Sequence, residues 1–205
     1  YYHQNQNSHT SGNNGGFVVT DIVKKPIIYI YPIEKMDVEV KLGNPQYLSC
    51  TYPKYKNGWS VTADVDGTLV DKNTGKNLYA LYWEGKEVPK NINLKEGFCV
   101  KGKDTATFLE EKLSLLGLGD KEAEEFIIYW LPKMEENNYN YIRFETKEEQ
   151  DKSMPLEITP KPDNLIRVMM DWKGLDEKIE VQEQNLETPI REGYTVVEWG
   201  GTEIK

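Results

Sequence analysis

The stretch WSVTADVDGTLVD, residues 59–71, decides the fold class. Apolar residues at positions 59, 61 and 63 alternate with hydroxyl residues at 60 and 62, so an extended chain would separate them onto two faces. This alternation is typical of an antiparallel strand with one buried face. Asp66 and Gly67 then predict a two-residue hairpin turn, because glycine tolerates a positive φ and aspartate bonds nearby backbone. We therefore expect a β-hairpin with Asp66 and Gly67 as its structural turn.

The same letters match D-x-D-G-T, the signature of the haloacid-dehalogenase phosphotransferases, in which Asp64 would be the nucleophile. That nucleophile ends a strand buried on both faces of a parallel sheet, and such strands read as continuous apolar runs. The run before Asp64 alternates instead, and the lysine, hydroxyl and acidic companions of the signature form no convincing set. A calcium loop with Asp64 and Asp66 as metal ligands is also disfavoured, because Gly75 occupies the position of the bidentate glutamate. We expect neither a metal nor a cofactor.

Strand patterns continue on both sides of this hairpin, and MDVEVKL at 36–42 alternates in the same way. The pattern becomes helical at 104–117 and 120–131, with Asp104 as an N-cap, Gly117 at C′ and Pro132 ending the second helix. Strand-like runs then resume, including KIEVQEQ at 178–184. Because strands and helices do not alternate, a doubly wound parallel sheet is disfavoured. The pattern predicts an α+β fold, predominantly antiparallel and meander- or sandwich-like, with a central helical hairpin at about 104–131.

Composition indicates how the chain is organised and which partners it disfavours. Residues 1–16 are mostly Asn, Gln, Ser, Gly and His, which predicts a polar disordered tail or linker. Residues 17–205 are expected to form a single α+β domain, with a division into 17–103 and 104–205 as the alternative. The net charge of -9 disfavours nucleic acid and anionic membrane surfaces as partners. No apolar run approaches the roughly 20 residues that a transmembrane segment needs.

The cysteines and histidines restrict the chemistry further. Cys50 and Cys99 both lie in strand-like sequence, and we expect two small buried side chains or, as the alternative, a single disulfide. The two histidines of the chain, His3 and His9, belong to the polar tail. The folded part therefore has no histidine for a catalytic thiol, a Ser-His-Asp triad or a His-ligated metal site.

Three acidic residues stand directly beside tryptophans, as Trp83–Glu84, Asp171–Trp172 and Glu198–Trp199. Paired carboxylates could serve a glycan or peptide hydrolase, so Glu84, Asp171 and Glu198 are the catalytic candidates. Exposed Trp83, Trp172 and Trp199 could instead stack on a sugar or peptide, which makes them the binding candidates. Neighbouring side chains of a strand point to opposite faces, however. We expect the tryptophans to be structural, with the acidic side chains in solvent.

Several longer stretches resemble an uncharacterised bacterial domain family, found chiefly in low-GC Gram-positives and often in proteins that look exported or membrane-tethered. They include KPIIYIYP at 25–32, CTYPKYKNGW at 50–59, LYWEG at 81–85, GFCVKGKDT at 97–105, FIIYWLP at 126–132 and GYTVVEWGGT at 193–202. The resemblance spans about residues 25–202 and implies no activity, cofactor or site residue. In that family DGTL recurs while the position of Asp64 is not always acidic, which implies that the turn is kept and the nucleophile is not.

Taken together, these features predict an extracytoplasmic bacterial module, either structural or interacting, that is tethered to the membrane or cell surface through the polar N-terminal segment. It would be non-enzymatic, with a cell-wall or protein partner. The alternatives are the cell-wall hydrolase and the sugar- or peptide-binding domain described above.

Overall fold

The computed structural model describes residues 17–205, so the predicted polar tail lies outside the described residues. In chain order the elements are β1 (Phe17–Tyr31), β2 (Met36–Leu42), β3 (Leu48–Tyr52), β4 (Trp59–Ala63), β5 (Leu69–Asp71), β6 (Asn77–Leu78), β7 (Leu81–Ile92), β8 (Phe98–Lys101), α1 (Thr105–Leu115), α2 (Asp120–Met134), β9 (Tyr139–Phe144), α3 (Lys147–Ser153), β10 (Leu156–Thr159), β11 (Asn164–Leu175) and β12 (Thr195–Glu203). Short 3-10 turns at Pro45–Tyr47 and Gly102–Asp104 complete them.

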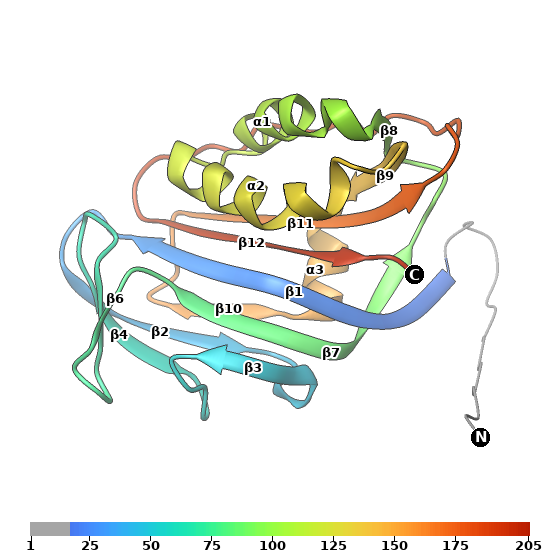
Figure 1. Ribbon diagram of the computed structural model, residues 1–205. Helices are drawn as coiled ribbons and strands as arrows, with labels where there is room; N and C mark the ends of the chain where they lie inside the picture. The colour runs from blue at the N-terminus through green and yellow to red at the C-terminus, as the bar shows by residue number, and fades with distance from the viewer. Residues whose placement is uncertain (1–16) are drawn as a thin grey trace, which may run out of the picture.

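These elements form three layers (Figure 1). The middle layer, sheet A, has seven strands in the order β3-β7-β1-β12-β11-β9-β8. Helices α1 and α2 cover one face of it, and the five-stranded sheet B, in the order β10-β2-β4-β5-β6, covers the other. Both sheets are mostly antiparallel, with β11 and β12 as a parallel pair in sheet A. The predicted α+β class and the helical pair are therefore confirmed.

The central strands of sheet A are buried on both faces, which explains the continuous apolar run in β1. Ile28 and Ile30 pack in the core between the two sheets, whereas Ile27 and Tyr29 pack against the helices. Sheet B has one buried face, and its strands alternate as predicted, with β4 buried at every second residue. Alternation of apolar and polar residues therefore identifies strands of the outer sheet, whereas a continuous apolar run identifies a strand of the middle sheet.

The predicted hairpin joins β4 to β5, but its turn differs in detail. The Gly67 N–H donates to the Asp64 carbonyl at 3.0 Å, and the Asp64 N–H donates to the Thr68 carbonyl at 2.9 Å. Val65 and Asp66 are therefore the central residues, and Gly67 follows them at φ +89°. This is a three-residue loop with glycine in the left-handed region, not the predicted two-residue Asp-Gly turn. The prediction of a positive φ at Gly67 is correct.

The helical hairpin begins and ends close to the predicted positions. Asp104 occupies the N-cap of α1 without a side-chain capping bond, and Gly117 has φ +92° just past its C-terminus. The predicted end of the second helix at Leu131 is wrong. Helix α2 continues through Pro132 to Met134. The N–H that proline lacks would have paired with the carbonyl of Ile128, whose residue is 66% exposed, so water can replace that bond.

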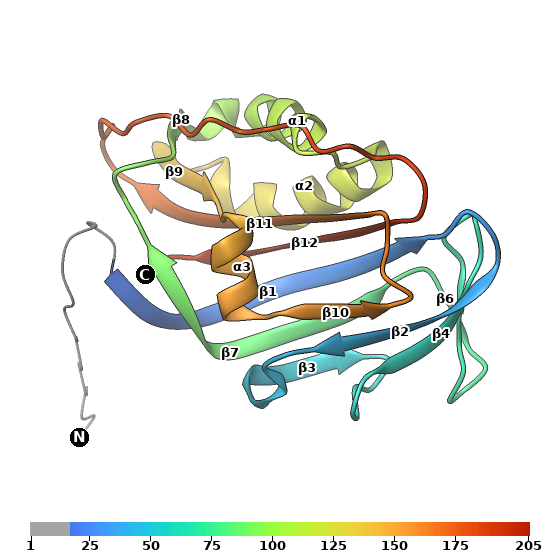
Figure 2. The same ribbon diagram turned by 180° about the vertical axis from the view of Figure 1, so that it is seen from behind.

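A long connection without regular structure, residues 176–194, returns the chain from β11 to its parallel neighbour β12. We call it the strap, and it crosses in front of α1 in Figure 2. The strand predicted at 178–184 is wrong, since this part of the strap makes a single bridge, between Gln182 and Glu96. The amide of Gln184 instead bonds the N–H and the carbonyl of Phe144, at 2.8 and 2.9 Å. A side chain thus replaces a strand at this edge of β9.

Candidate functional site

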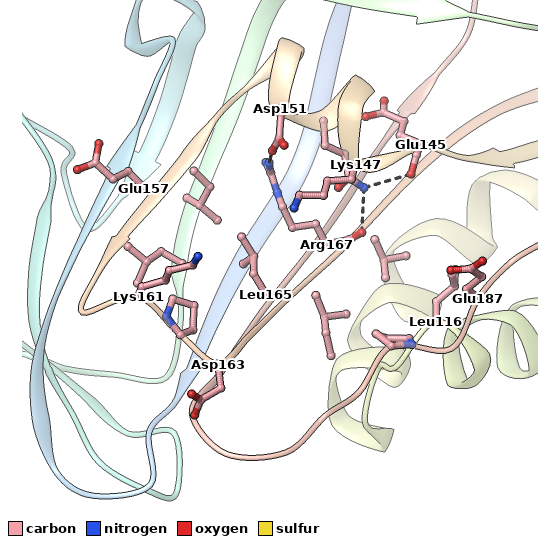
Figure 3. A pocket seen from close by; sticks show the side chains of 17 residues that line it. Leu116, Glu145, Lys147, Asp151, Glu157, Lys161, Asp163, Leu165, Arg167 and Glu187 are labelled. Atoms are coloured by element: carbon pink, nitrogen blue, oxygen red, sulfur yellow. Dashed lines mark hydrogen bonds and ion pairs between the residues drawn. The ribbon is translucent and has the colours of Figure 1, made fainter.

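A groove of about 620 Å³ opens where β9 ends and the chain turns into α3 (Figure 3). We call it the β11 groove. Its floor is the start of β11, and Leu165 lies in its centre, 39% exposed. The remaining walls come from α3 (Lys147, Gln150, Asp151), from β10 and the turn after it (Leu156, Glu157, Ile158, Lys161, Asp163), and from the end of α1 with the strap (Leu116, Glu187, Pro189). The groove is therefore apolar at its centre and charged at its rim.

A buried network of charged side chains lies beneath α3, on the sheet B face of sheet A. The Arg143 guanidinium donates to both carboxylate oxygens of Glu149, at 2.9 and 3.0 Å, and to Asp171 Oδ2 at 3.2 Å. Lys90 Nζ lies 3.3 Å from Asp171 Oδ1 and also contacts Glu145, the network member that lines the groove. The side chains of Lys90, Arg143, Glu145 and Asp171 are all less than 5% exposed. Burial at this level is tolerated because each charge has a partner of opposite sign.

A second branch of buried charge is centred on Arg167 of β11, which also lines the groove. Its Nε donates to Glu198 Oε2 at 2.6 Å, and its Nη2 donates to the carbonyl of Met154 at 2.9 Å. The other Glu198 oxygen accepts from the indole N–H of Trp83 at 2.8 Å. Arg167 Nη1 makes no hydrogen bond within the described residues and lies 3.6 Å from Asp151.

Glu145 relieves an imbalance of charge in this region. The cations Lys90, Arg143 and Arg167 face four well-buried carboxylates, from Glu145, Glu149, Asp171 and Glu198. Burial, together with repulsion by Asp171, raises the pKa of Glu145 to about 7, although Lys90 acts in the opposite direction. Burial by itself would lower the pKa of Lys90, but Asp171 and Glu145 raise it above its ordinary value. A proton on Glu145 thus offsets the excess negative charge.

Helix α3 covers this network, and local sequence positions it. Thr146 accepts from the backbone N–H of Glu149, and the Glu149 carboxylate accepts from the N–H of Thr146, which makes a capping box. The same carboxylate holds Arg143, so the cap and the network share one side chain. Helix α3 was not predicted from the sequence, although the Thr-x-x-Glu spacing is a recognisable signal for it.

Two of the predicted catalytic candidates lie in the network, and the third lies elsewhere. Asp171 is 1% exposed and Glu198 is fully buried, so the expectation that these acidic side chains lie in solvent is wrong. They point away from their neighbouring tryptophans as expected, but that face of sheet A is buried too. Glu84 extends from the helix side of β7, where it pairs with Lys24 at 3.5 Å. The three carboxylates do not converge, and none of them lines the groove.

The predicted binding tryptophans are structural. Trp83 and Trp172 are 1% exposed and Trp199 is fully buried, so none of them offers a face to a ligand. Trp83 belongs to the core between the sheets, and the other two belong to the core beneath α1 and α2.

The two cysteines lie too far apart for a disulfide. Cys50 lies on β3 and Cys99 on β8, at opposite edges of sheet A. Strands are about 4.8 Å apart, so these edges are separated by roughly 29 Å, and a disulfide needs Cα atoms within about 7 Å. Cys50 is exposed, contrary to the prediction of a buried side chain. Asp64 and Asp66 lie at an exposed turn, and no group of three or more metal-ligating side chains occurs within residues 17–205.

Comparison of the chain with protein-family models, with curated proteins and with solved structures gave no match. In the part of the chain that the structure describes, no helix is long and apolar enough to cross a membrane. Any inference about function must therefore start from the groove and the network of buried charges.

Proposed function

We propose that this chain is a non-enzymatic interaction module that works outside the bacterial cytoplasm. The observation that carries the proposal is that Asp171 and Glu198 are each paired with a buried arginine. Each of these carboxylates is buried and held by an arginine, so neither is available as an acid or base for a substrate. The β11 groove, with its apolar centre and charged rim, is suited to hold a partner.

The composition of residues 1–16 supports the proposed location, because a polar tether of this kind is common between an anchor and a folded domain in exported bacterial proteins. The resemblance of residues 25–202 to a family often found in exported proteins supports it as well. The partner would then be a cell-wall component or another surface protein.

Cys50 provides a direct test of location, because it is an exposed cysteine on an edge strand. A membrane-impermeant maleimide added to intact cells should label the wild-type chain. The Cys50→Ser variant should lose most of the signal, since Cys99 is partly buried. A chain that is labelled only after lysis would contradict the proposed location.

The hydrolase alternative is favoured by one specific observation, the position of Glu145. This carboxyl lines the groove, and its pKa is raised to about 7 by burial and by Asp171, as for a general acid. Incubation with purified cell-wall glycan and peptide fragments distinguishes the two functions. The interaction module predicts no released product. Turnover that is lost in Glu145→Gln, under conditions where tryptophan fluorescence shows this variant to be fully folded, would establish the hydrolase.

A further inference from the structure

Half of β11 is an unpaired strand edge that faces the β11 groove. On one side β11 pairs with β12 from Asn164 to Trp172, whereas on the other side β9 pairs only with its second half, from Met170 to Leu175. The chain leaves sheet A at Glu145, whose N–H donates to the carbonyl of Met169 as the last bond of that ladder. Beyond this point the groove occupies the position that a longer β9 would have taken.

The hydrogen bonds of β11 show which of its backbone groups face the groove. The N–H of Asn164 donates to the carbonyl of Tyr194, and the carbonyl of Trp172 accepts from the N–H of Ile204. The backbone N–H and C=O groups of the even-numbered residues of β11 therefore point toward β12. Backbone groups alternate sides along a strand. The backbone N–H and C=O groups of the odd-numbered residues Leu165 and Arg167 therefore point away from β12, as the carbonyl of Met169 does.

Part of this edge is already satisfied by a side chain. The amide of Gln150 in α3 donates to the carbonyl of Arg167 at 2.9 Å. Within the described residues, no hydrogen bond is present for the N–H of Arg167 or for either backbone group of Leu165. Two donors and one acceptor thus remain open at the floor of a groove, and their spacing is that of a strand ladder.

The walls of the groove fit an extended chain. An added strand would project alternate side chains toward α3 and β10 on one side, and toward the strap on the other. Leu165 in the centre of the groove offers apolar contact, with Lys161 and Asp163 on one side of it and Glu187 on the other (Figure 3). A partner that brings its own backbone donors and acceptors would complete the edge.

The rim indicates the charge of the partner. Glu157, Asp163 and Glu187 are exposed carboxylates without an ion pair among residues 17–205, and they outnumber the rim lysines, Lys147 and Lys161. The chain as a whole carries a net charge of -9, which attracts cations over a longer range.

We propose that the β11 groove binds an extended, positively charged peptide segment of another protein, which adds to sheet A as a strand beside Leu165 and Arg167. This inference rests on the proposed function as an interaction module and names its partner class and binding mode. The added strand runs antiparallel to β11, in line with β9.

Selection of random dodecapeptides displayed on phage against the intact chain supplies the probes. The enriched peptides are synthesised, labelled with fluorescein and titrated by fluorescence anisotropy. We expect these peptides to carry Lys or Arg and to bind the wild-type chain. Methylation of alternate backbone nitrogens should abolish binding in the phase that faces β11 and have little effect in the other phase.

Two variants at one position separate the backbone from the side chain. Leu165→Pro removes the N–H that faces the groove, and this N–H is not part of the ladder with β12, so the fold should persist. Loss of one such hydrogen bond should weaken binding roughly 3- to 10-fold. Leu165→Ala shortens the same side chain but keeps the N–H, and it should weaken binding less. Glu187→Lys should also weaken binding of the cationic peptides.

Several results would overturn this proposal. The first is a selection that enriches no peptide, and the second is enrichment of acidic peptides. The third is equally tight peptide binding by the wild-type chain and by a Leu165→Pro variant whose urea midpoint is unchanged. If Leu165→Pro unfolds, equal loss of binding in both methylation phases would overturn the proposal independently. A dimer that excludes peptide would make a second copy of the chain the occupant. Surface labelling without peptide binding would refute only this inference, whereas peptide binding by a chain protected inside the cell would refute only the proposed location.

Discussion

Replacement of Lys90 by methionine would leave Glu145 and Asp171 buried without the ammonium group that contacts both carboxylates. Methionine nearly matches the lysine stem in length, so the main loss is the charge. Removal of one partner from a buried ion pair costs roughly 3–5 kcal/mol, because the remaining charge is left uncompensated. Glu145 already has a raised pKa and can take up a proton, which offsets part of this loss. We therefore expect a cost near the lower limit, about 3 kcal/mol at pH 7.5, and a smaller cost at pH 5.5.

Urea unfolding followed by tryptophan fluorescence measures this cost, because Trp83, Trp130, Trp172 and Trp199 are all buried in the folded chain. The double variant Lys90→Met/Glu145→Gln should recover about 1–2 kcal/mol, since the amide needs no counter-charge. The matched control is Lys152→Met, which removes a lysine from an exposed pair with Glu148 and should leave the urea midpoint unchanged.

The reasoning would be refuted if Lys90→Met cost less than about 1 kcal/mol, or if its cost did not decrease toward acid pH. It would also be refuted if Glu145→Gln destabilised Lys90→Met as much as it destabilises the wild-type chain. Any of these three results would mean that the three charges are not coupled in the folded protein.

Further predictions concern the hairpin, the titration of the network and the strap. Gly67→Val should cost about 2–4 kcal/mol in urea unfolding, because φ is +89° and a Cβ would lie 2.8 Å from Tyr31 Cε1. Gly75→Val, at φ +71° with no neighbour within 4 Å, should cost only about 1–2 kcal/mol; equal costs would exclude the steric contribution. Glu145 has a pKa raised from 4.5 to about 7 by burial and Asp171, so the folded chain keeps a proton that the unfolded chain releases. Its contribution to stability should be complete below pH 4.5 and lost as the pH rises to about 7, and Glu145→Gln should flatten that dependence; an unchanged slope would contradict the assignment. Gln184→Ala should cost about 1–2 kcal/mol through two lost bonds to the end of β9 and should speed amide exchange there; unchanged exchange would show that water replaces the amide.

Much of the fold was predictable because local signals in the sequence specify it. Alternation with period 2 identified β2 and β4 as strands with one buried face, and period 3.6 identified α1 and α2. The positive φ at Gly67 followed from the turn chemistry of Asp-Gly. The errors occurred where long-range contacts decide, as in the strap, where Ile179 and Val181 read as a strand but pack against a small cluster of Ile92, Tyr141 and Ile204.

The groove and its network were not predicted, although part of the signal is visible in the sequence. Arg143 and Arg167 each interrupt an apolar run, in YIRF and LIRVMM, and a charge at such a position requires a buried partner. The identity of that partner was not predictable from spacing. Glu198 lies 31 residues from Arg167, and Asp171 lies 28 residues from Arg143.

The sequence by itself determined the half-buried strands β2 and β4, the helical pair α1 and α2, the positive φ at Gly67, and that the adjacent acid and tryptophan side chains point to opposite faces. Only the tertiary structure decided that both faces of β11 and β12 are buried. The sequence of a strand does not show how many layers pack onto its sheet. That packing placed Asp171 and Glu198 among buried cations instead of in solvent. The early departure of β9 into α3 likewise left one edge of β11 open to the groove, which depends on strand pairing across the whole sheet.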